Sequence, residues 1–210
     1  MSNYQLFQND LPLQSLKSFK GDITIDTETL GLNIKRDRLC LIQLRNESNK
    51  KVYLIKFDKD ISPANSKNIK SLLENKSLTK IFHYARFDMA VLKENLNINV
   101  RNVFCTKIAS KLTRTYSSKH GLKDLVKEIL NVDLDKTEQT SDWSQKKLTK
   151  QQIQYAMNDV IYLSDLKKNL EAKLLEAKRL KTFKSIMNFL DTRVELDLMG
   201  WENTDIFAHK

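Results

Sequence analysis

One short stretch, in which an apolar strand runs directly into two acids, constrains this chain more than any other feature. Residues 22–27 alternate polar and apolar side chains, which predicts a β-strand. Asp26 and Glu28 stand one residue apart at its end, so both point to the same face. Neighbouring carboxylates repel each other, and burying them without a partner is costly. Either positive charge lies between them, or both are solvated at the strand end.

The composition favours one soluble domain with a nucleic-acid partner. The 210 residues are 40% hydrophobic and include only 4 glycines and 2 prolines, so we expect residues 1–210 to form a single domain with a packed core. The net charge of +10 favours a polyanionic partner such as nucleic acid. The alternative is that the lysines only keep the protein soluble.

The N-terminus and the cysteines indicate a cytoplasmic protein. The N-terminal residues contain no apolar signal-peptide core, and no apolar run approaches the roughly 18 residues of a membrane-spanning helix, so we expect no membrane partner. Cys40 and Cys105 are too few to build a zinc site by themselves, and we expect two buried thiols in a reducing compartment.

The order of the predicted elements defines an α/β fold with a mixed sheet. Three strands, at 22–27, 38–45 and 51–57, are joined by turn-like segments that suit an antiparallel meander. Two short strands follow within 79–85 and 100–106. Apolar spacing predicts helices at 65–76, 86–96, 106–113, 121–130, 149–178 and 180–196. Helix–strand alternation after the meander, followed by a helical second half, is typical of an α/β domain.

Two further segments carry acids that the fold can bring to the strand ends. Asp88 begins a predicted helix, and favourable placement at a helix N-terminus would by itself explain it. Tyr155 and Asp159 are spaced i and i+4, which places both on one face of the helix at 149–178. Alone, Tyr155 would be an ordinary half-buried core residue.

Taken together, the four acids predict a site for hard cations. Carboxylate and water ligands suit Mg²⁺ or Mn²⁺. Two such ions about 3.5–4 Å apart can clamp the attacking and leaving oxygens of a phosphoryl displacement. A basic protein with an acidic metal site suits nucleic-acid hydrolysis.

Three segments resemble the exonuclease motifs of the DEDD superfamily. They are "DTET" at 26–29, "HYARFD" at 83–88 and "YAMND" at 155–159, and the tyrosine four residues before the last acid is typical of the DEDDy branch. Nearly the whole chain resembles bacterial ribonuclease D in its short form, without the helical accessory domains that follow the exonuclease domain in longer members. The sequence departs from many relatives at Tyr84, where they have asparagine.

The resemblance implies a ribonuclease H-like core with a five-stranded mixed sheet flanked by helices. It implies that Asp26 bridges two divalent cations, that Glu28 and Asp159 complete one cation site, and that Asp88 holds the second cation. Tyr155 would orient the attacking water or hydroxide. No small-molecule cofactor is implied.

Further residues are candidate substrate contacts, each with a structural alternative. Thr29 and Leu32 align with positions that contact the terminal nucleotide in related proofreading exonucleases, and simple packing is the alternative for Leu32. His83 is interpreted first as a hydrogen-bonding residue, and His120 either touches substrate or shapes a turn. Trp143 either stacks on a base or anchors the core. The candidate phosphate contacts are Lys111, Arg114, Lys119 and Lys123.

The leading functional hypothesis is a metal-dependent 3′–5′ exoribonuclease that releases nucleoside 5′-monophosphates. Its expected partner is RNA with a single-stranded 3′ end, and tRNA precursors are the example considered. One alternative is a 3′–5′ DNA exonuclease for proofreading or repair. Another is an RNA-binding module without catalysis, although the intact acids argue against it.

Overall fold

One mixed β-sheet forms the centre of the protein. The computed structural model describes residues 4–135, 137–138 and 140–209. Within these residues six strands follow the order β1-β4-β3-β2-β5-β6. They are β1 (Tyr4–Gln8), β2 (Ile23–Thr29), β3 (Leu39–Asn46), β4 (Val52–Lys56), β5 (Lys80–Phe82) and β6 (Val103–Cys105). The antiparallel meander β2–β3–β4 is confirmed, and β1, β5 and β6 each pair in parallel, which makes the sheet mixed.

The described sheet has six strands rather than the predicted five, and the additional strand is β1. β1 is an edge strand that pairs only with β4. Leu6 in its centre is 47% exposed, so the strand lacks the clear alternation of buried and exposed positions that identifies β2. Its conformation depends on pairing with a partner that lies more than 40 residues further along the chain.

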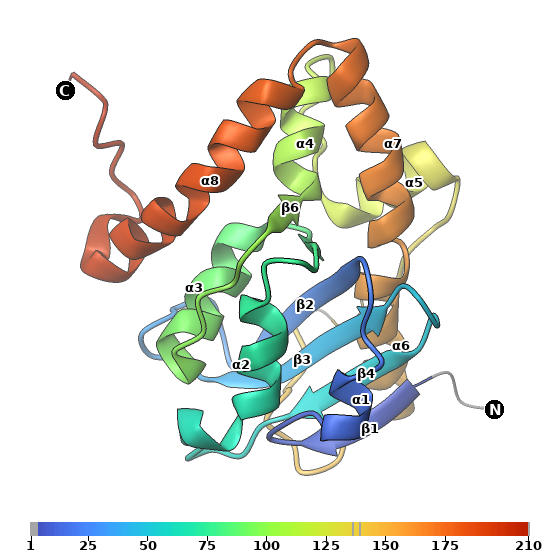
Figure 1. Ribbon diagram of the computed structural model, residues 1–210, viewed down its shortest axis with the longest axis vertical. Coiled ribbons are helices and arrows are strands. Elements are labelled where there is room, and N and C mark those ends of the chain that lie inside the picture. Colours follow the sequence, from blue (N-terminus) through green and yellow to red (C-terminus); the bar gives the residue numbers. More distant parts are fainter. Residues whose placement is uncertain (1–3, 136, 139, 210) are drawn as a thin grey trace.

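Helices cover both faces of the sheet (Figure 1). The helical elements are α1 (Leu13–Leu16), η1 (Pro63–Asn65), α2 (Lys67–Glu74), α3 (Ala85–Leu96), α4 (Thr106–Thr113), α5 (Leu122–Leu130), α6 (Lys150–Ile161), α7 (Leu163–Glu176), α8 (Leu180–Leu196) and η2 (Asp197–Trp201). α2 and α3 lie on one face of the sheet and α6 lies on the other (Figure 1). None of the described helices combines the length and hydrophobicity needed to cross a bilayer.

The core is divided by the sheet. Ile23 and Ile25 of β2 pack in the cluster that contains the buried side chains of α2 and α3. The opposite face of the meander packs Leu41 and Leu54 against Ala156 and Val160 of α6. A third cluster joins β6 to α4, α5 and α7. Both cysteines are buried free thiols, as the sequence predicts.

The helix predicted over 149–178 is two helices rather than one. α6 ends at Ile161, and α7 begins at Leu163 after a bend at Tyr162. After the bend, α7 runs beside α4 (Figure 1) and also contacts β2 and β5. η2 returns to α3, where Arg86 donates to Asp197 over 2.7 Å, so the segment around 196–201 packs back onto the domain as expected.

Candidate active site

The strand β2 presents two of the predicted acids to the face covered by α6. Asp26 and Glu28 alternate with residues that pack against α3, so their carboxylates point the other way. Gln43 of β3 lies directly opposite Asp26 and is fully buried. Its Nε2 donates to Glu28 Oε1 over 3.3 Å, which fixes the orientation of that carboxylate.

The helix α6 brings Tyr155 and Asp159 to the same place. Its start is fixed by a capping box, in which the Thr149 side chain and the Gln152 side chain each bond the backbone of the other. Carboxylate oxygens of Asp26, Glu28 and Asp159 lie within 4.8 Å of one another. Sequence positions more than 130 residues apart therefore converge in one acidic cluster.

The fourth acid, Asp88, approaches from the opposite face of the sheet. It lies in the first turn of α3 and is only 3% exposed. The hydroxyl of Thr27 donates to its Oδ1 over 2.7 Å. Asp88 does not belong to the tight three-carboxylate group, but it is close enough for its charge to raise the pKa of Asp26.

The electrostatics of this site favour a divalent cation. Burial raises the pKa of Asp26 well above its ordinary value, and Asp88, Asp159 and Glu28 raise it further. Burial, followed by Asp159 and Asp88, likewise raises the pKa of Glu28. Burial also raises the pKa of Asp88 to about 7, although the Thr27 hydrogen bond opposes the shift. Mutual repulsion among clustered carboxylates is relieved when a cation binds, and all-oxygen donors suit Mg²⁺ or Mn²⁺.

The phenol of Tyr155 remains protonated in this environment. Burial raises its pKa, and the surrounding carboxylates of Asp159, Glu28 and Asp26 raise it further. A protonated phenol donates a hydrogen bond and cannot act as a base. Its ring lies 6.0 Å from that of Trp143, which is only 2% exposed.

A cavity of about 580 Å³ opens over the acidic cluster, and Asp26, Glu28, Tyr155 and Asp159 line it. Small-ligand sites typically occupy about 300–1,000 Å³. Four of the five candidate substrate contacts also line the cavity: Thr29, Leu32, His83 and Trp143. Leu32 is 85% exposed at the rim, so it is not held there by core packing.

The two candidate histidines differ in position. His83 lines the cavity, and its Nδ1 lies 2.9 Å from Thr106 Oγ1. His120 is absent from the cavity lining, and its Nδ1 lies 2.8 Å from Ser110 Oγ. This contact agrees with the turn-shaping alternative for His120.

Several residues near the site were not anticipated from the sequence. Gln43 contacts Glu28, and the signal for it was a single amide inside the apolar stretch "LCLIQL". Lys107 lines the cavity with its Nζ 4.1 Å from the centroid of the Tyr84 ring. Tyr84 itself has φ of +74°, a left-handed conformation that asparagine adopts more readily than tyrosine.

Of the candidate phosphate contacts, Lys123 lies at the site and Arg114 does not. Lys123 lines the cavity. Arg114 does not contact it, because its side chain is fully buried and paired with Glu128. Arg114 therefore supports the fold between α4 and α5, and its proposed phosphate contact is excluded.

A mixed sheet with acids at the end of its second strand is typical of the ribonuclease H-like α/β fold. The structure of Escherichia coli RNase D, 24% identical, shows the same fold with a TM-score of 0.73 over 86% of this chain and 46% of that one. A family model described as 3′–5′ exonuclease matches residues 7–175. This chain belongs to the 3′–5′ exonuclease family.

Solved structures that match the full length of this chain include the nuclease NrnC, which is distinct from ribonuclease D. Brucella melitensis NrnC bound to pGG is 44% identical, with a TM-score of 0.92 over 99% of this chain and 98% of that one. The same nuclease with bound Mg²⁺ is 43% identical, with a TM-score of 0.91.

The resemblance to ribonuclease D is weaker than the resemblance to NrnC. Ribonuclease D of Desulfotalea psychrophila is 30% identical over 178 residues, which are 83% of this chain and 46% of that protein. The chain spans less than half the length of the curated ribonuclease D proteins at the top of that comparison. The similarity to ribonuclease D therefore supports the exonuclease family alone.

Proposed function

We propose that this protein is a metal-dependent 3′–5′ exoribonuclease that cleaves short RNA, down to dinucleotides, into nucleoside 5′-monophosphates. The observation that carries the proposal is the convergence of Asp26, Glu28 and Asp159 within 4.8 Å in a cavity that Tyr155 also lines. The solved NrnC structures support the substrate, because a nuclease similar over the full length is bound to pGG and, separately, to Mg²⁺.

The residues of this chain would hold two divalent cations, Mg²⁺ or Mn²⁺. Asp26, Glu28 and Asp159 would hold one, and Asp26 with Asp88 would hold the other, with Asp88 acting through water. The chemistry supplied by bound cations is activation of water and neutralisation of charge at the scissile phosphate. Gln43 keeps Glu28 oriented, and Tyr155 donates a hydrogen bond that orients the attacking water.

The cavity walls would place the 3′-terminal nucleotide. Trp143 is nearly buried against Tyr155, so it forms a fixed wall rather than a mobile stacking platform. Leu32 is exposed at the rim and offers an apolar contact to a base. Lys107 and Lys123 supply positive charge on the cavity lining for the phosphate groups.

Trimming of longer RNA, tRNA 3′ ends included, is the second candidate substrate class. The similarity to ribonuclease D over 83% of this chain favours it. Cleavage of DNA by the same site is the remaining enzymatic alternative.

A length and sugar comparison tests these proposals. The dinucleotide pGG, a longer 5′-labelled RNA and the matched DNA would be incubated with Mg²⁺, Mn²⁺ or EDTA. We expect cation-dependent release of guanosine 5′-monophosphate from pGG, with faster turnover than on the longer strands. Preferential shortening of the long RNA would favour the trimming function, and preference for DNA would contradict the RNA assignment. Binding without hydrolysis under all conditions would leave only the RNA-binding alternative.

A further inference from the structure

The C-terminal end of α6 lies close to the catalytic acids. The helix ends at Ile161, two residues after Asp159, and the chain bends at Tyr162. The last carbonyl groups of a helix lack regular partners within it. Here two side chains of the sheet donate to them: Thr24 Oγ1 to Val160 O over 2.8 Å, and Arg45 Nη1 to Ile161 O over 2.6 Å.

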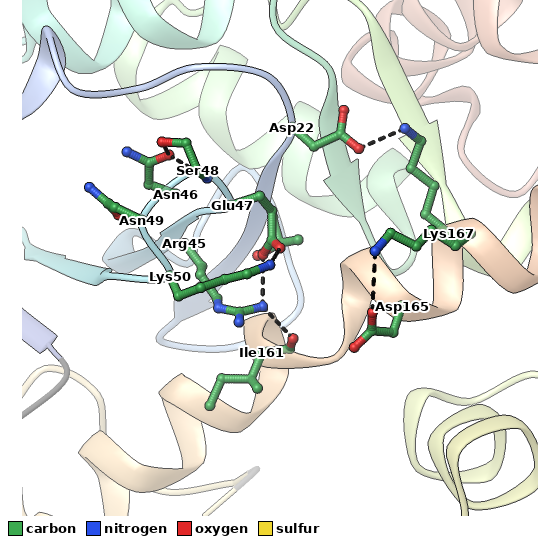
Figure 2. A network of polar contacts seen from close by, with 12 residues as sticks. Asp22, Arg45, Asn46, Glu47, Ser48, Asn49, Lys50, Ile161, Asp165 and Lys167 are labelled. Carbon is green, nitrogen blue, oxygen red and sulfur yellow. Dashed lines mark hydrogen bonds and ion pairs between the residues drawn. The ribbon is translucent and has the colours of Figure 1, made fainter.

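The guanidinium of Arg45 is itself fixed in place. Its Nη1 lies 2.7 Å from Glu47 Oε1, and Lys50 Nζ lies 2.6 Å from the other oxygen of Glu47. The side chains of Arg45 and Glu47 are only 13% and 8% exposed. Figure 2 shows Arg45 extended from β3 between Glu47 and the carbonyl of Ile161.

The Thr24 hydrogen bond connects the strand that carries Asp26 and Glu28 to the helix that carries Asp159. Thr24, Asp26 and Glu28 lie on the same face of β2, at successive alternate positions. Val160, which accepts the hydrogen bond, follows Asp159 directly. The hydroxyl therefore sets the distance between the strand that carries two acids and the helix turn that carries the third.

The charge of Arg45 also suits its location. The C-terminal end of a helix carries partial negative charge, which disfavours a carboxylate in the last turn. Asp159 occupies that turn. A guanidinium on the terminal carbonyl offsets this charge, and it does so without occupying the cavity, whose lining includes neither Arg45 nor Thr24.

We propose that Thr24 and Arg45 are positioning residues that hold Asp159 against Asp26 and Glu28 and so set the cation affinity of the site. Neither residue lines the cavity over the acids, so both would act through Asp159. The inference rests on the proposed function, because it assumes that the three acids bind a divalent cation.

The test compares matched substitutions. Thr24→Val removes the hydroxyl and keeps the shape, Thr24→Ser keeps the hydroxyl, and Arg45→Met removes the guanidinium. Thr113→Val is a control, since Thr113 Oγ1 donates to a helix carbonyl over the same 2.8 Å, in α4. Arg101→Met is the second control, because Arg101 pairs with Asp191 on α8. Neither Thr113 nor Arg101 lines the cavity over the acids.

Mn²⁺ affinity, measured by electron paramagnetic resonance without substrate, is the primary readout. We expect Thr24→Val and Arg45→Met each to weaken Mn²⁺ binding by roughly tenfold or more, as residues supporting a metal ligand typically do. Excess Mn²⁺ should restore hydrolysis of pGG with an unchanged KM. Thr24→Ser and both controls should bind Mn²⁺ as the unsubstituted protein does.

Unchanged Mn²⁺ affinity in folded Thr24→Val and Arg45→Met proteins would overturn the inference, as would an equal loss in the controls. If Thr24→Val does not fold, Arg45→Met and Thr24→Ser decide the matter by the same criteria. Failure of the proposed function is distinguishable: the unsubstituted protein would then bind no Mn²⁺, and Asp159→Asn would change nothing.

Discussion

The hydroxyl of Thr27 and the carboxylate of Asp88 are joined by a buried hydrogen bond of 2.7 Å that connects β2 to the first turn of α3 beside the acidic cluster. Thr27 lies between Asp26 and Glu28 in the chain but points to the opposite side of β2. One strand therefore supplies two acids directly and orients a third through the intervening residue. The first threonine in "DTET", Thr27, thus has a structural role of its own.

Replacing Thr27 with valine should impair the site without removing an acid. The hydrogen bond lowers the pKa of Asp88, so its loss should raise that pKa above about 7. Since cations bind the ionised carboxylate, the pH at which kcat/KM reaches half its maximum should move upward. The profile is measured on pGG with Mg²⁺, beside the Thr113→Val control. A superimposable profile would show that Thr27 does not act on Asp88.

The metal-free protein should become less stable as pH rises from about 4 to about 7. The pKa of Asp88 is about 7 in the folded protein against an ordinary value of 3.8, so the folded state holds a proton that the unfolded state has released. The raised pKa values of Asp26 and Glu28 act in the same direction. Bound Mn²⁺ should offset the loss, because it favours the ionised acids.

Melting temperatures with EDTA and with Mn²⁺, measured across this pH range, check the expectation. Asp88→Asn should make the Tm of the metal-free protein depend less on pH. The control Asp60→Asn, at an exposed position, should leave the dependence of Tm on pH unchanged. A Tm that is insensitive to Mn²⁺ at neutral pH would count against a cation site among these acids.

Removal of either central acid should abolish hydrolysis while RNA binding largely survives. Asp26→Ala and Asp159→Ala each delete a member of the group whose oxygens lie within 4.8 Å, while Lys107 and Lys123 of the cavity remain. Turnover of pGG and affinity for a short RNA are measured for both, with Asp60→Asn as the control. Substantial turnover in both alanine variants would refute the assignment of the site.

Local patterns predicted much of this structure because local physics determines it. The helices at 106–113 and 180–196 begin and end where apolar spacing places them. The shared face of Asp26 and Glu28 follows from strand alternation alone. The motifs predicted that distant acids would meet, and three of them do so in one cluster.

Features that depend on distant partners were missed. No proline or glycine marks the bend at Tyr162, where side chains of Thr24 and Arg45 donate to the last carbonyls of α6 from more than 110 residues away. The sequence predicts Arg114 to be a surface cation that contacts phosphate, whereas in the structure its side chain is buried and paired with Glu128. The strand β1 likewise requires β4.

The charge of Lys107 should be visible in the salt dependence of RNA binding. Each phosphate neutralised in a single strand contributes about −0.7 to the slope of log K against log salt. If Lys107 contacts one phosphate, Lys107→Met should make the slope shallower by about 0.7. Binding of a short RNA is measured at several salt concentrations in the inactive Asp26→Ala background. Lys59→Met, an exposed lysine outside the cavity, is the control, and equal slopes in the two variants would exclude Lys107 as a phosphate contact.

Two substitutions of Tyr155 separate catalysis from packing. Tyr155→Phe keeps the ring beside Trp143 and deletes only the hydroxyl that is proposed to orient the attacking water. It should preserve Mn²⁺ affinity and KM and lower kcat by roughly 10²-fold or more, as expected for a lost transition-state contact. Tyr155→Ala should lower the rate equally and, in addition, destabilise the protein by about 3 kcal/mol through the cavity left beside Trp143.

The losses of rate and of stability in these two variants distinguish the two possible roles of Tyr155. For a core residue alone, Tyr155→Phe would be nearly silent in rate and only Tyr155→Ala would be harmful, through stability. For a residue that orients the nucleophile, both variants lose rate and only the alanine variant loses stability. Single-turnover rates and Tm for both proteins therefore decide. Because the pKa of the phenol is raised, the rate of the unsubstituted enzyme should show no loss that tracks ionisation of Tyr155 near neutral pH. A Tyr155→Phe enzyme with full kcat would leave the carboxylates to support catalysis without the tyrosine.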